Sequence, residues 1–196
     1  MDIVGRAKAI LTTPKTEWQA IEGEPATVTD LFTGYAVIMA LLPLVGGLLQ
    51  MLLVRSSFGL PFGGFLVPLV LSYVIGLAVL YAVILIADVL APSFGGSRGQ
   101  VPAAKLIIYS STPVWIAGFF HFIPGLALLF SLAGFAYGAY LLYLGVPTLM
   151  KVPEAKAGGY TAVLIVIWLL LALFVAGAIA GAVVGSFVLG SAAYPM

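Results

Sequence analysis

Charged residues divide this chain into long uncharged intervals, and the intervals predict its helices. Asp30 and Arg55 bracket an uncharged run at residues 31–54. About 20 helical residues, at 1.5 Å per residue, cross a hydrocarbon core of ~30 Å, so this run predicts one membrane-spanning helix. The next run begins with SSFGLPFGG, a sequence typical of a turn, and we expect a second span after it.

The uncharged interval from Leu106 to Met150 is too long for one span. HFIPG at residues 121–125 is its strongest turn signal, so two spans joined by a short hairpin are expected there. A last apolar run begins near Tyr160. The pattern therefore predicts an all-α polytopic membrane protein, with an N-terminal segment at residues 1–30 and a five-helix bundle at 31–190. The five spans are expected at about 31–54, 65–88, 105–121, 125–149 and 160–186.

Apolar residues also recur at helical spacing before the first span. They predict a short amphipathic helix that lies on the membrane surface or packs on the loops, and they are Ile3, Val4, Ala7, Ile10 and Leu11. Thr13 and Pro14 form a helix-start signal for a second short helix at about Pro14 to Ile21, in which Trp18 is able to sit at the level of the lipid headgroups. Thr27 and Asp30 resemble a capping arrangement at the entry to the first span.

The composition supports a membrane protein and excludes several function classes. Apolar residues make up 63% of the chain and charged residues 8%, whereas soluble domains carry ~25% charged residues. A net charge of +1 offers no basic footprint for nucleic acid. The absence of cysteine and the single His121 leave little for thiolate or metal chemistry, so neither a metal nor another cofactor is expected.

GGSRG at residues 95–99 matches the G-x-S-x-G pattern of serine hydrolases. The pattern needs a strand–turn–helix setting and a histidine near the serine, whereas His121 is expected on the opposite side of the membrane. The chain is therefore predicted not to be an enzyme.

The basic residues predict the orientation, because short cytoplasmic loops carry an excess of Lys and Arg. With five spans, Arg55 alone lies on one side of the membrane. We therefore expect the N-terminus in the cytoplasm and the C-terminus outside, in the inner or plasma membrane. The other side holds Arg6, Lys8, Lys15, Arg98, Lys105, Lys151 and Lys156.

Small residues repeat at four-residue spacing in the last two spans, which favours close helix packing within the chain or between copies of it. These residues are Gly134, Gly138, Gly177, Gly181 and Gly185.

Helix-breaking and polar residues inside the spans leave a transport pathway open as an alternative. Prolines interrupt membrane helices at several points, and YSSTP at residues 109–113 is the richest polar cluster at membrane depth. Its hydroxyls are expected to bond back to their own helix. Asp88, at the end of the second span, is either a hydrated interfacial residue or an ion site. The candidate pathway residues are Pro43, Asp88, Ser111, Thr112 and Pro113.

Three stretches resemble the Yip family, named for binding Ypt and Rab GTPases, and specifically its bacterial branch. They are AYLLYLGVPTLMKVPEAKAGGYT at residues 139–161, TTPKTEWQAIEGEPATVTDLFTGYAVIMALLP at 12–43, and YSSTP. The resemblance implies a non-enzymatic membrane protein, linked in eukaryotes to vesicle traffic through prenylated Rab partners and an extended N-terminal domain. Here about thirty residues precede the first span, which leaves little room for a GTPase platform.

Two functions follow as hypotheses. The first is a membrane-organising or interaction scaffold with a cytoplasmic face at residues 1–30, 91–105 and 150–159, whose partners are lipid, another membrane protein or a second copy of the chain. The second is a transporter or channel for a small solute or ion. The interaction face of the first hypothesis includes Trp18, Tyr140, Tyr143, Gly145, Pro147, Lys151, Pro153 and Glu154.

Overall fold

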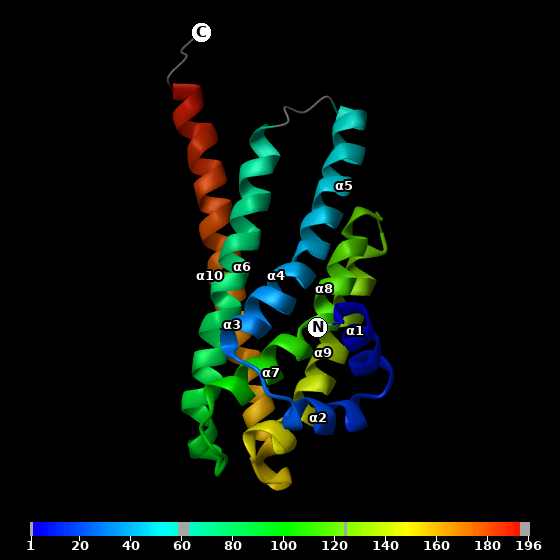
Figure 1. The fold of residues 1–196 in the computed structure, drawn as a ribbon. Coiled ribbons are helices and arrows are strands. Elements are labelled where there is room, and N and C mark those ends of the chain that lie inside the picture. The colour runs from blue at the N-terminus through cyan, green and yellow to red at the C-terminus, as the bar shows by residue number, and fades with distance from the viewer. Residues whose placement is uncertain (1, 59–62, 124, 193–196) are drawn as a thin grey trace.

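The computed structural model describes the backbone of residues 2–58, 63–123 and 125–192, and the side chains of residues 2–53, 66–123 and 125–177. Five helical segments among the described residues are long and apolar enough to cross a membrane, which confirms the predicted all-α bundle of five spans (Figure 1). They are Val28–Leu53, Leu66–Phe94, Gln100–Phe122, Ala127–Met150 and Glu154–Gly177.

Two short helices precede the spans. α1 (Ile3–Thr12) begins at Asp2, whose side chain accepts a hydrogen bond from the Gly5 N–H, and α2 (Pro14–Gly23) begins with the predicted proline. α2 packs on α9 (Ala127–Met150), α1 packs on α2, and Trp18 is only 1% exposed. Trp18 therefore does not take the headgroup position open to it in the sequence, because its indole is buried between helices.

The first span is irregular. It starts with α3 (Val28–Leu31), where Thr27 and Asp30 form the predicted capping box. A single π-helical turn, η1 (Phe32–Ala36), leads into α4 (Val37–Met39) and then α5 (Leu41–Phe58). The break falls between α4 and α5, where the ring of Pro43 cannot donate a backbone hydrogen bond to Met39.

The third span lies at the centre of the bundle. It consists of α7 (Gln100–Ser110) and α8 (Thr112–Phe119), which are separated by a break at Ser111. α7 packs on α6 (Gly63–Leu90) and α9 (Ala127–Met150), and α8 packs on α5 and α9. The window of this span is 72% buried, against 17–28% for the other four. The third span is therefore surrounded by the other helices, whereas most residues of the other four windows lie at least partly on the surface of the bundle.

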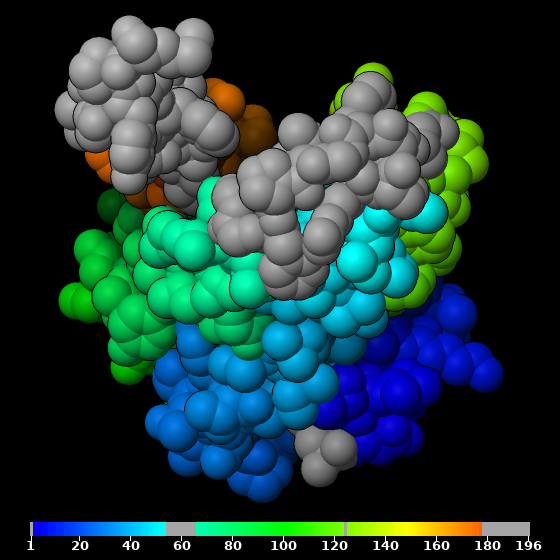
Figure 2. All heavy atoms as spheres, turned by 90° about the horizontal axis from the view of Figure 1, so that it is seen from above, coloured from blue at the N-terminus to red at the C-terminus, as the bar shows by residue number. Residues whose placement is uncertain are grey.

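Short 3-10 turns, η2 (Ala91–Phe94) and η3 (Phe120–Phe122), follow α6 and α8, and α10 (Glu154–Ala192) is the last helix of the described residues. We call residues 1–30, 91–105 and 150–159 the N-terminal face. Helices gather tightly at this face, whereas α10, α6 and α5 diverge toward the other end (Figure 1). Seen from that other end, α10 and the α8–α9 hairpin lie on opposite sides of the molecule, with α6 and α5 between them (Figure 2).

Candidate functional site

A buried lysine holds α2 against the third span. Lys105 is 5% exposed, and its ammonium donates to the carbonyls of Ile21 at 2.7 Å, Glu24 at 2.5 Å and Glu22 at 3.4 Å. These carbonyls close the last turn of α2, where helix carbonyls lack internal partners and the helix dipole favours a cation. Lys105 therefore caps α2 and fixes its end to α7.

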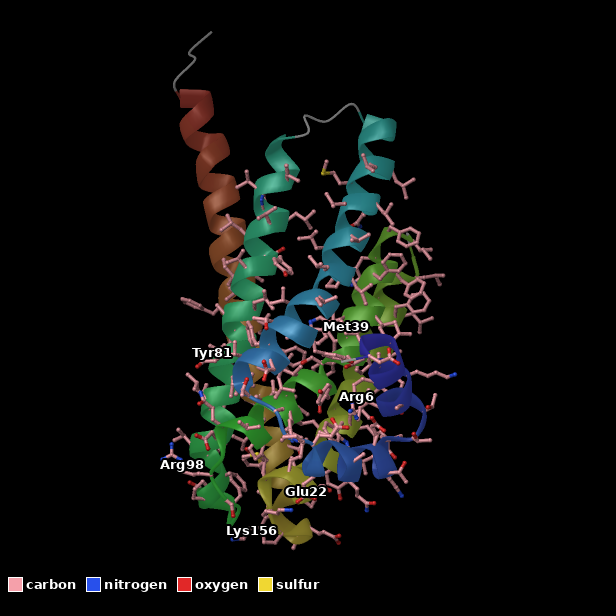
Figure 3. All side chains as sticks on the ribbon, viewed as in Figure 1. Arg6, Glu22, Met39, Tyr81, Arg98 and Lys156 are labelled. Atoms are coloured by element: carbon pink, nitrogen blue, oxygen red, sulfur yellow. The ribbon has the colours of Figure 1, made fainter. Side chains whose placement is uncertain are left out.

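Arg6 joins α1 to α2. Its guanidinium bonds to the carboxylates of Glu17 and Glu24 and lies 5.7 Å from the centre of the Tyr109 ring. Burial lowers the pKa of Arg6, but the hydrogen bond and charge of Glu24 and the charge of Glu17 raise it by more, so its pKa is raised overall. Figure 3 shows Arg6 on α1, with Glu22, Arg98 and Lys156 lower in the view.

Trp18 packs where α9 has no side chain. A Cβ added at Gly145 would lie 2.8 Å from the Trp18 ring and 2.7 Å from Leu106, so only glycine lets the indole approach this closely. Earlier on the same helix, the Tyr137 hydroxyl of α9 donates to the Leu11 carbonyl of α1 at 2.6 Å. Both short helices are thus attached to α9 as well as to α7.

The two loops of the N-terminal face interlock. The Ser97 N–H donates to the Met150 carbonyl at 2.8 Å, and a Cβ at Gly96 would lie 2.6 Å from the same oxygen. Phe94 meets the Tyr160 ring edge-on at 5.5 Å, and the Tyr160 hydroxyl donates to the carbonyl of residue 87 at 2.6 Å. The exit of α6 and the α9–α10 turn therefore form one packed unit.

Asp88 organises this same unit. One carboxylate oxygen accepts the Gly99 N–H at 2.6 Å, and the other lies 3.5 Å from the Arg98 guanidinium. The side chain is 15% exposed. The polar partners that the structure gives Asp88 thus belong to the loop after α6, and the transport role suggested for it stays a prediction.

The residues predicted for an interaction face divide into two groups. Trp18 and Gly145 are buried against each other, and Pro147 is partly buried. Exposed on the surface are Tyr140, Tyr143, Lys151, Pro153 and Glu154. Lys151 adopts a left-handed backbone conformation (φ 56°), and its ammonium pairs with Glu22 of α2. The role of these eight predicted residues in binding a partner stays a prediction.

Two hydroxyls of the YSSTP cluster, those of Ser111 and Thr112, are bonded within the protein, whereas the buried Ser110 hydroxyl has no hydrogen-bond partner among the described residues. The Ser111 hydroxyl donates to the Ile107 carbonyl at 2.8 Å, which confirms the expected bond to its own helix. Thr112 instead bonds to the Tyr35 hydroxyl at 2.9 Å, and both side chains are fully buried. Sequence reasoning missed Tyr35, which lies in the π-helical turn and whose partner is distant along the chain.

A cavity of about 320 Å³ opens between α5, α6, α8 and α10. We call it the bilayer cleft. Of the candidate pathway residues, Pro43 and Ser111 line it, whereas Asp88, Thr112 and Pro113 are not among its lining residues. Its walls include Ser72, Tyr73, Gly76, Leu80, Val114, Trp115, Trp168 and Ala172.

Glycines bring the helices around the YSSTP break close together. A Cβ at Gly134 would lie 2.6 Å from Ala117, and one at Gly138 would lie 2.9 Å from the Ser110 carbonyl. Gly177 has open space around it, and the packing predicted for Gly181 and Gly185 lies outside the described side chains. Gly118 lies outside the small-residue repeats of the sequence, and a Cβ added there would meet the Pro43 ring at 2.6 Å.

Ser97 and His121 lie in different parts of the fold. Ser97 belongs to the loop between η2 and α7, and His121 in η3 bonds to Ser131 at 2.9 Å. Within the described part of the chain, no group of three acidic or histidine side chains is placed to hold a metal ion. The contacts of Lys105, Arg6 and Trp18 and the interlocked loops hold helices and loops in place.

Comparison with known proteins places this architecture in a family. A family model described as the Yip1 domain matches residues 8–177, from the middle of α1 to α10. No curated protein and no solved structure was found to match. The matched segment contains the N-terminal helices, the YSSTP break and the interlocked loops, and the chain is an integral membrane protein of the Yip1 domain family.

Proposed function

We propose that this protein is a non-catalytic scaffold whose N-terminal face offers a fixed surface to partner proteins. The observation that carries the proposal is the capping of α2 by the buried ammonium of Lys105. Two helices that could have moved freely beside the membrane are instead held in place, α2 by bonds to the central span and α1 by bonds to α2 and α9. A surface that is ordered before binding loses less conformational entropy when a partner docks.

The exposed part of this face has the mixed chemistry of a binding rim. Glu22 and Lys151 pair across it, Pro153 and Glu154 extend it, and Tyr143 continues it along α9. Tyrosine and arginine are enriched at interfaces, and aromatic residues are also enriched where a membrane meets water. We infer that the face is cytoplasmic and that partners reach it from there and from within the bilayer.

Transport is the weaker alternative. Ser111 and Pro43 line the bilayer cleft, but the Ser111 hydroxyl is bonded to its own helix. On the other side of the break, α7 is buried from Ala103 to Ser110, and Asp88 bonds to the loop after α6. A conducting path would have to pass this closely packed region.

Site-specific photo-cross-linking in intact membranes tests the scaffold. A photoreactive side chain is placed at Lys15, Lys151 or Glu154, and at Leu126 and Leu129 near the other end as controls. All five positions are exposed. The same partner should be captured from the first three positions and from neither control. Equal capture from all five, or capture from none, contradicts the scaffold.

Purified protein in liposomes tests the alternative. Proton and monovalent-ion flux should equal that of empty liposomes, and Asp88→Asn should leave it unchanged. A flux that Asp88→Asn abolishes would instead establish a transporter.

A further inference from the structure

Of the described side chains that line the bilayer cleft, only three carry a hydroxyl group, and each of these hydroxyls already has a hydrogen-bond partner. Ser72 donates to the Leu69 carbonyl at 2.7 Å, and the Tyr73 hydroxyl donates to the Val37 carbonyl at 3.0 Å. The third, Ser111, donates to Ile107. Each hydroxyl donor on the wall is therefore used internally, and what the cleft offers an occupant is mainly hydrocarbon and the rings of Trp115 and Trp168.

Water is a poor occupant of such a space. An ordered water needs about two to four polar partners, and cavities lined by apolar side chains stay dry. The walls come from four of the five spans, so the medium next to the opening is lipid. Val70, Leu71 and Val74 of α6 are 45–55% exposed and continue the apolar surface beside the cleft.

The size of the cleft favours a chain over a helix. Its volume is about 320 Å³, near the lower end of the ~300–1,000 Å³ typical of ligand pockets. A helix is about 10 Å wide, so even a 15 Å length occupies roughly 1,200 Å³. A helix from a partner or from a second copy would therefore have to force α5, α6 and α10 apart.

We propose that the bilayer cleft binds one acyl chain of a membrane phospholipid, which enters between α5, α6 and α10. The chain lies against Trp168 and fills the space that the diverging helices leave open. It couples α5, α6 and α10 to the packed centre of the bundle. The interaction is one of area and shape, since the wall presents no spare hydroxyl donor.

Gly76 provides a sharp test. It lines the cleft, and a Cβ added there would meet no atom within 4 Å. Gly76→Leu should therefore fill the cleft without disturbing the backbone. Gly34→Leu is the matched control, because Gly34 is also a glycine of a span with no atom within 4 Å of an added Cβ, but it is not among the residues that line the cleft.

The first measurement uses tryptophan fluorescence. The protein is reconstituted in phospholipid with brominated acyl chains, which quench an indole on contact. Trp115 and Trp168 line the cleft, whereas Trp18 is buried against Gly145 and supplies an unquenched reference. The quenched fraction should fall in Gly76→Leu and stay unchanged in Gly34→Leu. Equal quenching in both variants contradicts the proposal.

The second measurement is native mass spectrometry of the purified chain in mild detergent. One phospholipid should remain bound to the unmodified chain and to Gly34→Leu, and Gly76→Leu should retain it about tenfold less, as loss of ~1.4 kcal/mol of apolar contact implies. A chain that carries no lipid, or a dimer that Gly76→Leu disrupts, overturns the proposal. Circular dichroism of both variants should match the unmodified protein, and a folded Gly76→Leu that keeps its lipid overturns it as well.

Discussion

At the scale of single residues, the absence of a side chain at Gly145 decides where the N-terminal helices lie. Gly145→Ala would place a methyl group 2.8 Å from the Trp18 ring and 2.7 Å from Leu106. Overpacking of this kind costs about 1–3 kcal/mol. We expect a matching loss of stability in thermal unfolding of the purified protein in detergent.

Gly158→Ala is the control for this change, since its added methyl group meets nothing within 4 Å and lies in helix α10. It should stabilise the protein by roughly 0.5–1 kcal/mol, because alanine gives up less conformational freedom than glycine in a helix. Equal effects of the two substitutions would show that Trp18 does not pack on Gly145.

Lys105 supplies the second prediction at this scale. Lys105→Met removes the donor shared by the carbonyls of Ile21, Glu22 and Glu24 and leaves them with a buried apolar neighbour. An unsatisfied buried acceptor costs about 1–3 kcal/mol. The Ile21 bond is buried and the Glu22 and Glu24 bonds are only partly buried, so we expect a loss of about 1–3 kcal/mol and faster hydrogen exchange in α2. Lys156→Met, on an exposed position of α10, should change stability by less than ~0.5 kcal/mol.

At the scale of elements, α1 and α2 act as one unit that Arg6 holds together. Arg6→Gln removes the bonds to Glu17 and Glu24. A loss of ~1.4 kcal/mol would raise amide exchange across α1 and α2 about tenfold, whereas Lys8→Gln, at an exposed position of α1, should leave it unchanged. Unchanged amide exchange in Arg6→Gln would show that contacts other than those of Arg6 hold α1 and α2 together.

The pH dependence of this contact follows from the raised pKa of Arg6. A raised pKa contributes stability that is complete below the unfolded value and is lost only as the pH rises through the folded one. Since the unfolded value of arginine is already above ~12, amide exchange rates in α1, corrected for the intrinsic effect of pH, should indicate the same protection from about pH 7 to 10. A loss of protection within that range would mean that another group holds the helix.

Hydropathy and helix-start signals predicted most of the elements. The charge-free runs predicted five spans, and Thr27, Asp30 and Pro14 predicted two helix starts. These features are local, since a cap depends on residues a turn apart and a span depends on its own length. Local signals also placed the start of the third span at residue 105, whereas the structure begins its helix at Gln100.

Contacts between distant elements were not predicted, for a physical reason. Hydropathy separates lipid from water, but it does not indicate which helix a given side chain meets. Lys105 counted only as a loop charge, although it caps a helix more than eighty residues earlier. Tyr35 and Gly118 likewise acquire their significance from partners on other spans.

At the scale of the whole molecule, the two ends differ in packing. The third span is 72% buried and ties the N-terminal face together, while α5, α6 and α10 diverge away from it. A rigid face and an open lipid-facing end can serve different partners at once. Which partners each end can meet depends on which end faces the cytoplasm. Orientation is therefore the property of the molecule that most needs measurement.

The chain contains no cysteine, which makes the orientation directly measurable. Lys156→Cys introduces an exposed thiol at the N-terminal face, and Leu126→Cys introduces one near the other end, where the leucine is 42% exposed. Because seven of the eight basic residues lie on the side of the N-terminal face under a five-span topology, we expect that face inside. A membrane-impermeant maleimide should label Leu126→Cys in intact cells and Lys156→Cys only after permeabilisation. The opposite pattern would put the proposed partner surface outside the cell and exclude a cytoplasmic scaffold.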